Sequence, residues 1–219
     1  QGVEALCLEL VDGQPRTYLV RARKAICAMP LYVAARVVKN IAGYGFDAKR
    51  DTPAYAPWMV ANFLLKRFPD ELPHAPLCWD NVVYQEPGLG YVVSTHQDIR
   101  VRPPEKTVFS AYVALSDRTP QQARKWLDTA SPEQLLALAS VDLQTAYGRD
   151  FASCVERVDI TVRGHAMAAP LPGFRSNAGL KALREHDGAI LFAHADLSGF
   201  SVFEEAAWWG DRAARLANK

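Results

Sequence analysis

The sequence predicts a fold of the α+β or α/β class, in which mixed sheets are combined with helices. Three observations predict it. The 219 residues are 49% hydrophobic and 22% charged, which is ordinary composition for a globular protein. Short apolar runs bounded by glycine and proline are typical of strands, and two later segments carry helix-start signals. A chain of this length can bury one core, or a core and a subdomain.

Charge and hydropathy exclude two classes of partner. The formal net charge is +1 and the charges are interspersed, so we expect no nucleic-acid partner. No run of about 18 apolar residues occurs, so we expect no membrane span. The chain begins with Gln1, which indicates either a removed leader or a piece of a longer chain. We expect a soluble protein and leave both the cytoplasm and the periplasm open.

Cysteines and histidines predict no metal site. The four cysteines form no C-x-x-C pair and have apolar neighbours, which favours buried thiols over a disulfide or a zinc site. The five histidines show no spacing typical of metal ligands. No G-x-S-x-G sequence occurs, which argues against a hydrolase of that type.

The N-terminal part is predicted to consist of strands followed by one helix. Residues 3–29 read as strands, with a hairpin turn at Asp12-Gly13 and a stop at Pro30. From Leu31 to Ile41 the apolar residues have helical spacing. The sequence GYGFDA at residues 43–48 fits a G-x-G-x-x-A dinucleotide pattern. However, it follows a predicted helix instead of a strand, so we interpret it as part of a loop.

The middle of the chain is predicted to form an antiparallel or mixed sheet with helices. Residues 57–116 contain several strand-like runs separated by proline and glycine. Thr119-Pro120 and Ser131-Pro132 each place a capping hydroxyl before a first-turn proline, with a glutamine three residues after the cap. Residues 155–162 alternate like a strand, residues 164–177 read as a loop, and a short helix follows.

The C-terminal part joins an apolar run, a carboxylate, a loop of small residues and a helix. Residues 189–193 lead to Asp196, which places this carboxylate at the carboxyl end of a strand, where open α/β sheets bind ligands. The helix is predicted to begin near Val202 or Phe203, and its first N–H groups favour an anion or an electron-rich ring. A strand, a loop and an alanine-rich core helix would fit the same residues, and the residues alone do not separate the two interpretations.

A resemblance separates them. Phe192-Ala-His-Ala-Asp196 and the helix EEAAWWGDRAA at residues 204–214 resemble the C-terminal FAD-binding motif of the flavin-dependent amine oxidase family. The segment VRARKAICAMP at residues 20–30 is similar to another segment of that family, and the middle of the chain resembles spermidine-dehydrogenase-like bacterial members. Two departures lie inside the motif: His194-Ala195 replaces the usual glycine, and Glu205 also stands where glycine is usual.

The resemblance implies FAD as cofactor and an amine-like small molecule as substrate. It implies an FAD-binding domain of the three-layer type, to which residues 1–45 and 187–219 contribute, and a mixed-sheet substrate domain with helices at residues 46–186. Asp196 would bind the ribityl or pyrophosphate region, and the N–H groups near Val202 and Phe203 would face the flavin. The cofactor-binding residues implied in this way are Ala28, Met29, Pro30, Ala195, Asp196, Ser201, Val202, Phe203 and Ala206.

Two departures from the family bear on the implied function, which is that of an FAD-dependent oxidoreductase acting on an amine. The Rossmann motif G-x-G-x-x-G, which holds the ADP half of FAD, has no match in the chain, so we expect a missing N-terminal half or a partner subunit to supply it. Val202 stands where the family often has an aromatic residue beside the flavin, which leaves a substrate other than an amine open. The alternative is a non-catalytic fragment or subunit that needs a partner chain carrying the dinucleotide-binding motif.

Three polar residues are further candidates for the substrate pocket. Asn81 lies near one predicted strand end and His96 at another, and we name these two as candidate catalytic residues. His165, in the predicted loop, is a candidate substrate contact. For each, a polar group that bonds to the backbone is the alternative.

Overall fold

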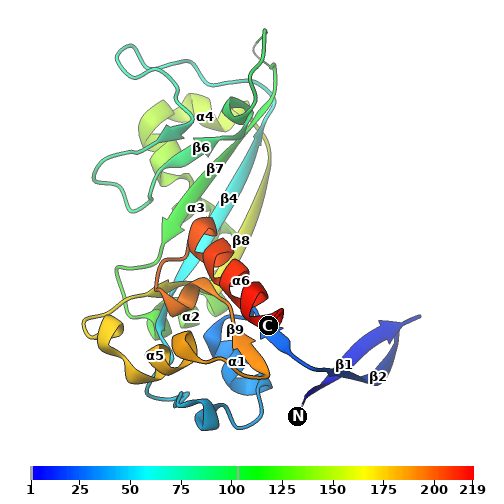
Figure 1. The fold of residues 1–219 in the computed structure, drawn as a ribbon. Helices are drawn as coiled ribbons and strands as arrows, with labels where there is room; N and C mark the ends of the chain where they lie inside the picture. The colour runs from blue at the N-terminus through cyan, green and yellow to red at the C-terminus, as the bar shows by residue number, and fades with distance from the viewer. Residues whose placement is uncertain (1, 103) are drawn as a thin grey trace. The chain divides into compact units, whose positions relative to one another are not determined.

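The computed structural model describes residues 2–102 and 104–219 and shows a mixed α/β fold in two compact units (Figure 1). Unit 1 consists of the segments Gln1–Ala54 and Ala168–Lys219, and unit 2 of Tyr55–Met167. The chain therefore leaves unit 1 once, forms unit 2, and returns. Each unit has a hydrophobic core of its own.

Unit 1 begins with an antiparallel hairpin. Strands β1 (Val3–Val11) and β2 (Gln14–Ala22) pair along their whole length. Asp12 and Gly13 connect them with φ values of 49° and 76°. Two consecutive positive φ values match the right-handed twist of a hairpin, and the Asp-Gly pair adopts them readily, so the turn predicted from the sequence is confirmed.

The core of unit 1 surrounds a two-stranded parallel sheet. Strand β3 (Ala25–Cys27) pairs with β9 (Ile190–Phe192), although 162 residues separate Cys27 from the start of β9. Buried residues of three helices pack around this pair. These helices are α1 (Leu31–Val37), α5 (Ala178–Glu185) and α6 (Phe203–Ala217). Short 3₁₀ turns complete the unit: η1 (Ile41–Tyr44), η3 (Phe174–Ser176) and η4 (Ala195–Leu197).

Unit 2 is built on a five-stranded sheet in the order β5-β6-β7-β4-β8. The long central strands alternate strictly between buried and half-buried residues, so one face is covered by the core. The strands are β4 (Ala54–Leu65), β5 (Asp80–Asn81), β6 (Tyr91–Val93), β7 (Thr107–Ala114) and β8 (Val155–Ala169). The turn η2 (Ser94–Gln97) follows β6.

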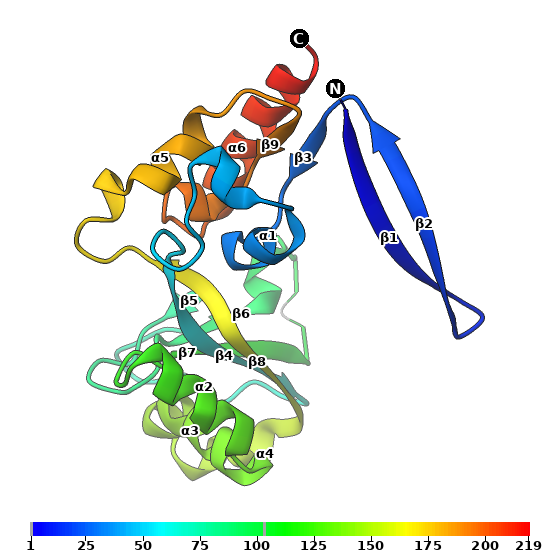
Figure 2. The same ribbon diagram turned by 90° about the horizontal axis from the view of Figure 1, so that it is seen from below.

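Three helices pack on the buried face of this sheet and lie together along one side of it in Figure 2. They are α2 (Pro120–Thr129), α3 (Pro132–Tyr147) and α4 (Arg149–Cys154). The capping boxes predicted at Thr119 and Ser131 are confirmed, because each hydroxyl accepts the N–H of the glutamine three residues later. Both helices begin where the sequence places them because these signals are local.

Two predicted boundaries are wrong. The helix expected at residues 31–41 ends at Val37, and Asn40 adopts a left-handed conformation with φ 55° before η1. The loop expected at residues 164–177 begins only after Ala169, because strand β8 continues through Gly164 and His165. The GYGFDA pattern lies in η1 and the turn after it, with neither a strand before it nor a helix directly after it.

Candidate cofactor site

The candidate site lies where the two parallel strands of unit 1 end. Cys27 is the register partner of Phe192, and the N–H of Ala193 donates to the carbonyl of Cys27 at 3.0 Å. Parallel strands end at the same edge of a sheet, which is where α/β folds bind ligands. The pairing therefore places residues 28–30 close to the start of the segment at residues 195–206, and these two segments contain every cofactor-binding residue implied by the resemblance.

Asp196 joins the two segments. The residue is 2% exposed, and its Oδ2 accepts the backbone N–H of Leu31 at 2.9 Å. This N–H belongs to the first turn of α1, where no intrahelical acceptor exists. The Nδ1 of His194 accepts the N–H of Asp196 at 3.1 Å and thereby orders the loop around the carboxylate. Asp196 is thus a buried group that links β9 to α1, and a role toward a ribityl chain stays a prediction.

The start of helix α6 carries no side-chain cap. Val202 is the N-cap residue and has no polar side-chain atom, and the first helical bond runs from the N–H of Ala206 to the carbonyl of Val202. Glu204 and Glu205 lie in the first turn, where their negative charges interact favourably with the positive end of the helix dipole. The N–H of Val202 donates to the carbonyl of Phe200 at 2.9 Å, whereas the N–H groups from Phe203 onward are available to an electron-rich acceptor.

Apolar side chains surround this helix start. Phe200, Val202 and Phe203 are exposed, while Ser201 accepts the N–H of Ala168 through its hydroxyl. An exposed apolar cluster beside unpaired N–H groups could bind a flat ring that has an electron-rich edge. The sequence identified this feature because the loop and the helix are continuous in the chain.

The remaining implied cofactor residues differ in exposure. Ala195 is buried, Met29 and Pro30 are half-buried, and Ala28 and Ala206 are exposed. Within α6, Ala213 is buried while Ala206 is exposed. Of the two tryptophans on this helix, Trp209 packs in the core and donates to the hydroxyl of Ser198 at 2.6 Å, whereas Trp208 is exposed.

Asn81 already has its side-chain hydrogen bonds satisfied by the backbone. Its Oδ1 accepts the N–H of Cys78 at 3.1 Å, and its Nδ2 donates to the carbonyl of Cys78 at 2.8 Å. A second, longer contact of 3.4 Å runs to the carbonyl of Tyr91. These bonds hold the loop before β5, as expected if the amide has a structural role and bonds to the backbone.

His96 and His165 lie at opposite ends of the sheet of unit 2. His96 belongs to η2, next to the hydroxyl pair of Thr95 and Thr107, and Thr107 is the register partner of Leu65 at the end of β4. His165 lies in β8 with its ring 5.9 Å from that of Tyr55. Tyr55 and Leu65 are separated by roughly 33 Å of extended strand. The two histidines therefore cannot act on the same reacting atom.

Each pocket near these candidates is separate. His96 lines a pocket of about 610 Å³ together with Phe68, Glu71 and Arg100. Asn81 lines another of about 520 Å³. His165 lines neither of these two pockets. Among the described residues, no group of three or more His, Cys, Asp or Glu side chains could hold a metal ion.

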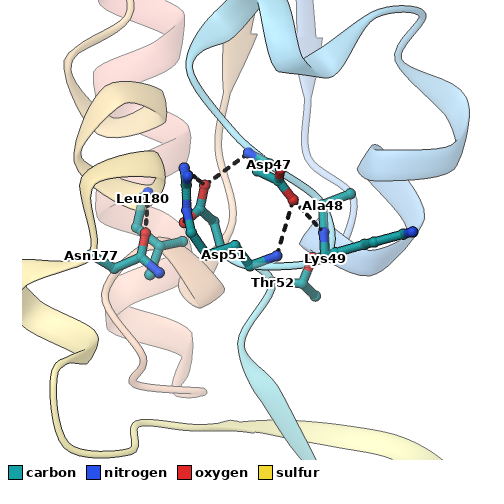
Figure 3. A network of polar contacts seen from close by, with 8 residues as sticks. Asp47, Ala48, Lys49, Asp51, Thr52, Asn177 and Leu180 are labelled. Atoms are coloured by element: carbon teal, nitrogen blue, oxygen red, sulfur yellow. Dashed lines mark hydrogen bonds and ion pairs between the residues drawn. The ribbon is translucent and has the colours of Figure 1, made fainter.

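Unit 1 also contains an ion pair that no pattern in the sequence predicted, between the exposed Arg50 and the buried carboxylate of Asp51. The carboxylate of Asp51 is 2% exposed and binds Arg50 through two contacts of 2.9 Å. It also accepts the N–H of Asp47 at 2.7 Å (Figure 3). The hydrogen bond from Arg50 lowers the pKa of Asp51 below its ordinary value. Gly179 makes room for this group, because a Cβ there would lie 2.1 Å from Oδ2 of Asp51.

This ion pair borders an open pocket of about 360 Å³. The amide of Asn177, which also lines the pocket, accepts the N–H of Leu180 at 2.9 Å and caps helix α5. The polar groups are therefore engaged in holding the loop at residues 47–52 and the start of α5. No sequence signal identifies this site, because aspartates in a stretch rich in glycine, proline and threonine are typical of any loop.

The comparisons with known proteins concern the fold. No family model and no curated protein matches the chain. Among solved structures, it is similar to the cyclohexylamine oxidase from Brevibacterium oxydans IH-35A, with a TM-score of 0.61 and 16% identity over 96% of this chain. It is also similar to a redesigned putrescine oxidase (TM-score 0.61, 12% identity, 99% of this chain) and to a reduced UDP-galactopyranose mutase (0.64, 13%, 91%).

The chain spans about half the length of the solved structures it matches, at 47%, 49% and 41% of those chains respectively. The expectation that the chain has the fold of the flavin-dependent amine oxidases, with only part of their length, is confirmed. In the part of the chain that the structure describes, no helix is long and apolar enough to cross a membrane. The chain therefore adopts the fold of about half of an amine oxidase such as cyclohexylamine oxidase or putrescine oxidase.

Proposed function

We propose that this chain is part of an FAD-dependent oxidoreductase of the amine-oxidase type. The observation that carries the proposal is the uncapped start of α6 at the edge where β3 and β9 end, in a fold shared with two amine oxidases. When bound, FAD supplies the acceptor for a hydride taken from a C–H bond next to an amine.

The residues of unit 1 fit the flavin half of this cofactor. The N–H groups of the first turn of α6, from Phe203 onward, would stabilise negative charge on a reduced ring, because they are fixed before the reaction begins. Asp196 would orient the segment at residues 28–31 beside it through the bond to Leu31. The nucleotide half finds no matching motif in the sequence, since the GYGFDA segment lies in η1 and a turn. A dinucleotide-binding domain, either in the same longer chain or in a partner subunit, would have to bind the nucleotide half.

The substrate side of the proposal rests on unit 2. His165 lies in β8 with its ring 5.9 Å from that of Tyr55, and it is the candidate that we retain as a substrate contact. His96 at the far end of the sheet and Asn81 with its backbone bonds are less suited to a catalytic role. We assign no essential base, because amine oxidation by a flavin needs only a deprotonated amine and a well-placed C–H bond.

A substrate other than an amine is the second candidate. The match to a UDP-galactopyranose mutase shows that the same fold occurs outside the amine oxidases. Val202, in the place of an aromatic residue, favours this candidate as well. The two are separated by screening amines against the flavin-loaded protein, with bleaching of the flavin absorbance as the readout.

The decisive experiment measures the mass and the visible absorbance of the protein purified from its source. Flavin bands would support the proposal. A colourless protein with the mass of the 219-residue chain, which takes up no flavin when FAD is added, would contradict it and favour the non-catalytic alternative.

A pair of variants on one helix tests the location of the flavin. Phe203→Glu replaces an exposed apolar side chain at the start of α6, where the flat ring would pack, with a carboxylate. Because Phe203 is 81% exposed, the fold should be retained. We expect flavin affinity to fall at least about tenfold. Trp208→Glu is the matched control, since it adds the same charge at an exposed position of the same helix and should leave affinity unchanged. Equal losses in both variants would place the flavin elsewhere.

A further inference from the structure

The β1-β2 hairpin carries four leucines on one uncovered face. Register partners in an antiparallel pair share a face, so Leu6, Leu8 and Leu10 lie on the same side as Leu19, the partner of Leu6. Their side chains are 78%, 68%, 72% and 48% exposed, respectively. We call these four residues the leucine face. No described residue of the chain covers it.

Exposure of this kind is unusual for a hairpin. Two-stranded hairpins are marginal in water, and a half-buried strand normally alternates between apolar and polar residues. Here the opposite face is apolar as well, with exposed Tyr18 and Val20. Figures 1 and 2 both show the hairpin projecting from the rest of unit 1. Apolar residues on both faces are typical of a hairpin that is covered on both sides inside a protein.

A second observation points to the same segment. The β3-β9 sheet has only two strands among the described residues, and β3 follows β2 after two residues. Parallel sheets occur almost only with several strands and with both faces covered. Ile26 of β3 is exposed. The segment at residues 3–27 thus combines an uncovered leucine face with a sheet that other strands could extend.

Size and charge select the kind of partner. Packing the leucine faces of two copies together would bury only about 600 Å² in total, since each face measures roughly 30 by 10 Å, and specific interfaces need about 1,200 Å². Residues 3–22 contain two arginines against two glutamates and one aspartate, so they lack the positive charge that draws a segment to anionic lipids. A larger apolar protein surface fits better.

Resting on the proposed function, we propose that the leucine face packs against the polypeptide that carries the dinucleotide-binding half of the flavoprotein fold. The solved structures that match this chain contain about as many residues again beyond the matched part. That polypeptide would cover the leucine face and add strands to the β3-β9 sheet. It belongs either to the same longer chain or to a separate subunit.

Cysteine labelling tests this proposal. Leu8→Cys is introduced at the chromosomal locus, and the protein is purified from its source. Maleimide reactivity is followed by peptide mapping, with exposed Cys78 of unit 2 as internal reference. Thr17→Cys, at the register partner of Leu8, guards against a disturbance caused by losing the leucine. The same variants are also produced as the isolated 219-residue chain.

We expect both cysteines to react at least tenfold more slowly than Cys78 in the source protein and at a similar rate to Cys78 in the isolated chain. Equal reactivity with Cys78 in the source protein would overturn the proposal. Protection in the isolated chain would also overturn the proposal. If it accompanies a dimer, a second copy covers the leucine face, and if it appears only with phosphatidylserine vesicles, a membrane does. The flavin spectrum of the same preparation is read separately, so protection without flavin would contradict the proposed function alone.

Discussion

At the scale of single residues, Asp196 is the group on which the candidate site depends. Its Oδ2 is the acceptor for the N–H of Leu31. Asp196→Ala would leave this buried donor without an acceptor, which costs about 1–3 kcal/mol of unfolding free energy. Asp196→Asn retains an oxygen at the same place and should lose less. Urea unfolding of the two variants measures the difference, and a stability of Asp196→Ala equal to that of the unchanged chain would show that the bond contributes nothing.

Asp51 gives a pH dependence at the same scale. Because the ion pair with Arg50 lowers the pKa of Asp51 in the folded state, its stabilising effect is present above the unfolded pKa of about 3.9 and is lost as pH falls through the folded pKa. We expect unfolding free energy to decrease as pH falls below about 4. Asp51→Asn should weaken this dependence and cost about 1 kcal/mol at neutral pH, because the Arg50 side chain is 68% exposed and water screens the pair.

Asp117 provides a matched control for Asp51. It also pairs with the arginine that follows it, Arg118, but its side chain is 63% exposed. Exposed ion pairs contribute little, so Asp117→Asn should change unfolding free energy by less than about 0.5 kcal/mol. A similar loss in both variants would mean that burial of Asp51 is not the cause of its effect.

At the scale of elements, the helix caps of unit 2 are the clearest case. Ser131→Ala removes the hydroxyl that accepts the N–H of Gln134, and Thr119→Ala does the same at Gln122. Each should lower unfolding free energy by about 0.5–2 kcal/mol. Since α3 places Ala139 and Leu143 in the core, the loss at Ser131 should also reduce amide protection along that helix. Hydrogen exchange measures this, and unchanged protection of α3 would contradict the role of the cap.

At the scale of the whole molecule, two separate cores predict two separable stabilities. Leu183 is buried in the core of unit 1 and Leu143 in that of unit 2. Truncation of either to alanine should cost about 2–5 kcal/mol. We expect Leu183→Ala to reduce amide protection in α5 and β9, and Leu143→Ala to reduce it in β4 and β7. Native-state hydrogen exchange reads both patterns, and a uniform loss across the chain in either variant would mean that the two units unfold together.

The candidate site was predictable where its parts are continuous in the sequence. The run from Ala189 through Asp196 to the start of α6 is one segment, so its strand, loop and helix follow from local patterns. The burial of Asp196 against Leu31 was not predictable, because the two are 165 positions apart in the sequence. The same holds for Asp51 and Gly179, whose close approach depends on how two loops meet.

Local sequence is sufficient to predict the hairpin turn at Asp12-Gly13 and the starts of α2, α3 and α6, because these depend on neighbouring residues. Which polar groups meet depends instead on the tertiary structure. It paired β3 with β9 and placed His96 and His165 at opposite ends of one sheet. It also left the leucine face uncovered. The physical reason is that strand pairing and burial join residues far apart in the chain, and no local pattern specifies their partners.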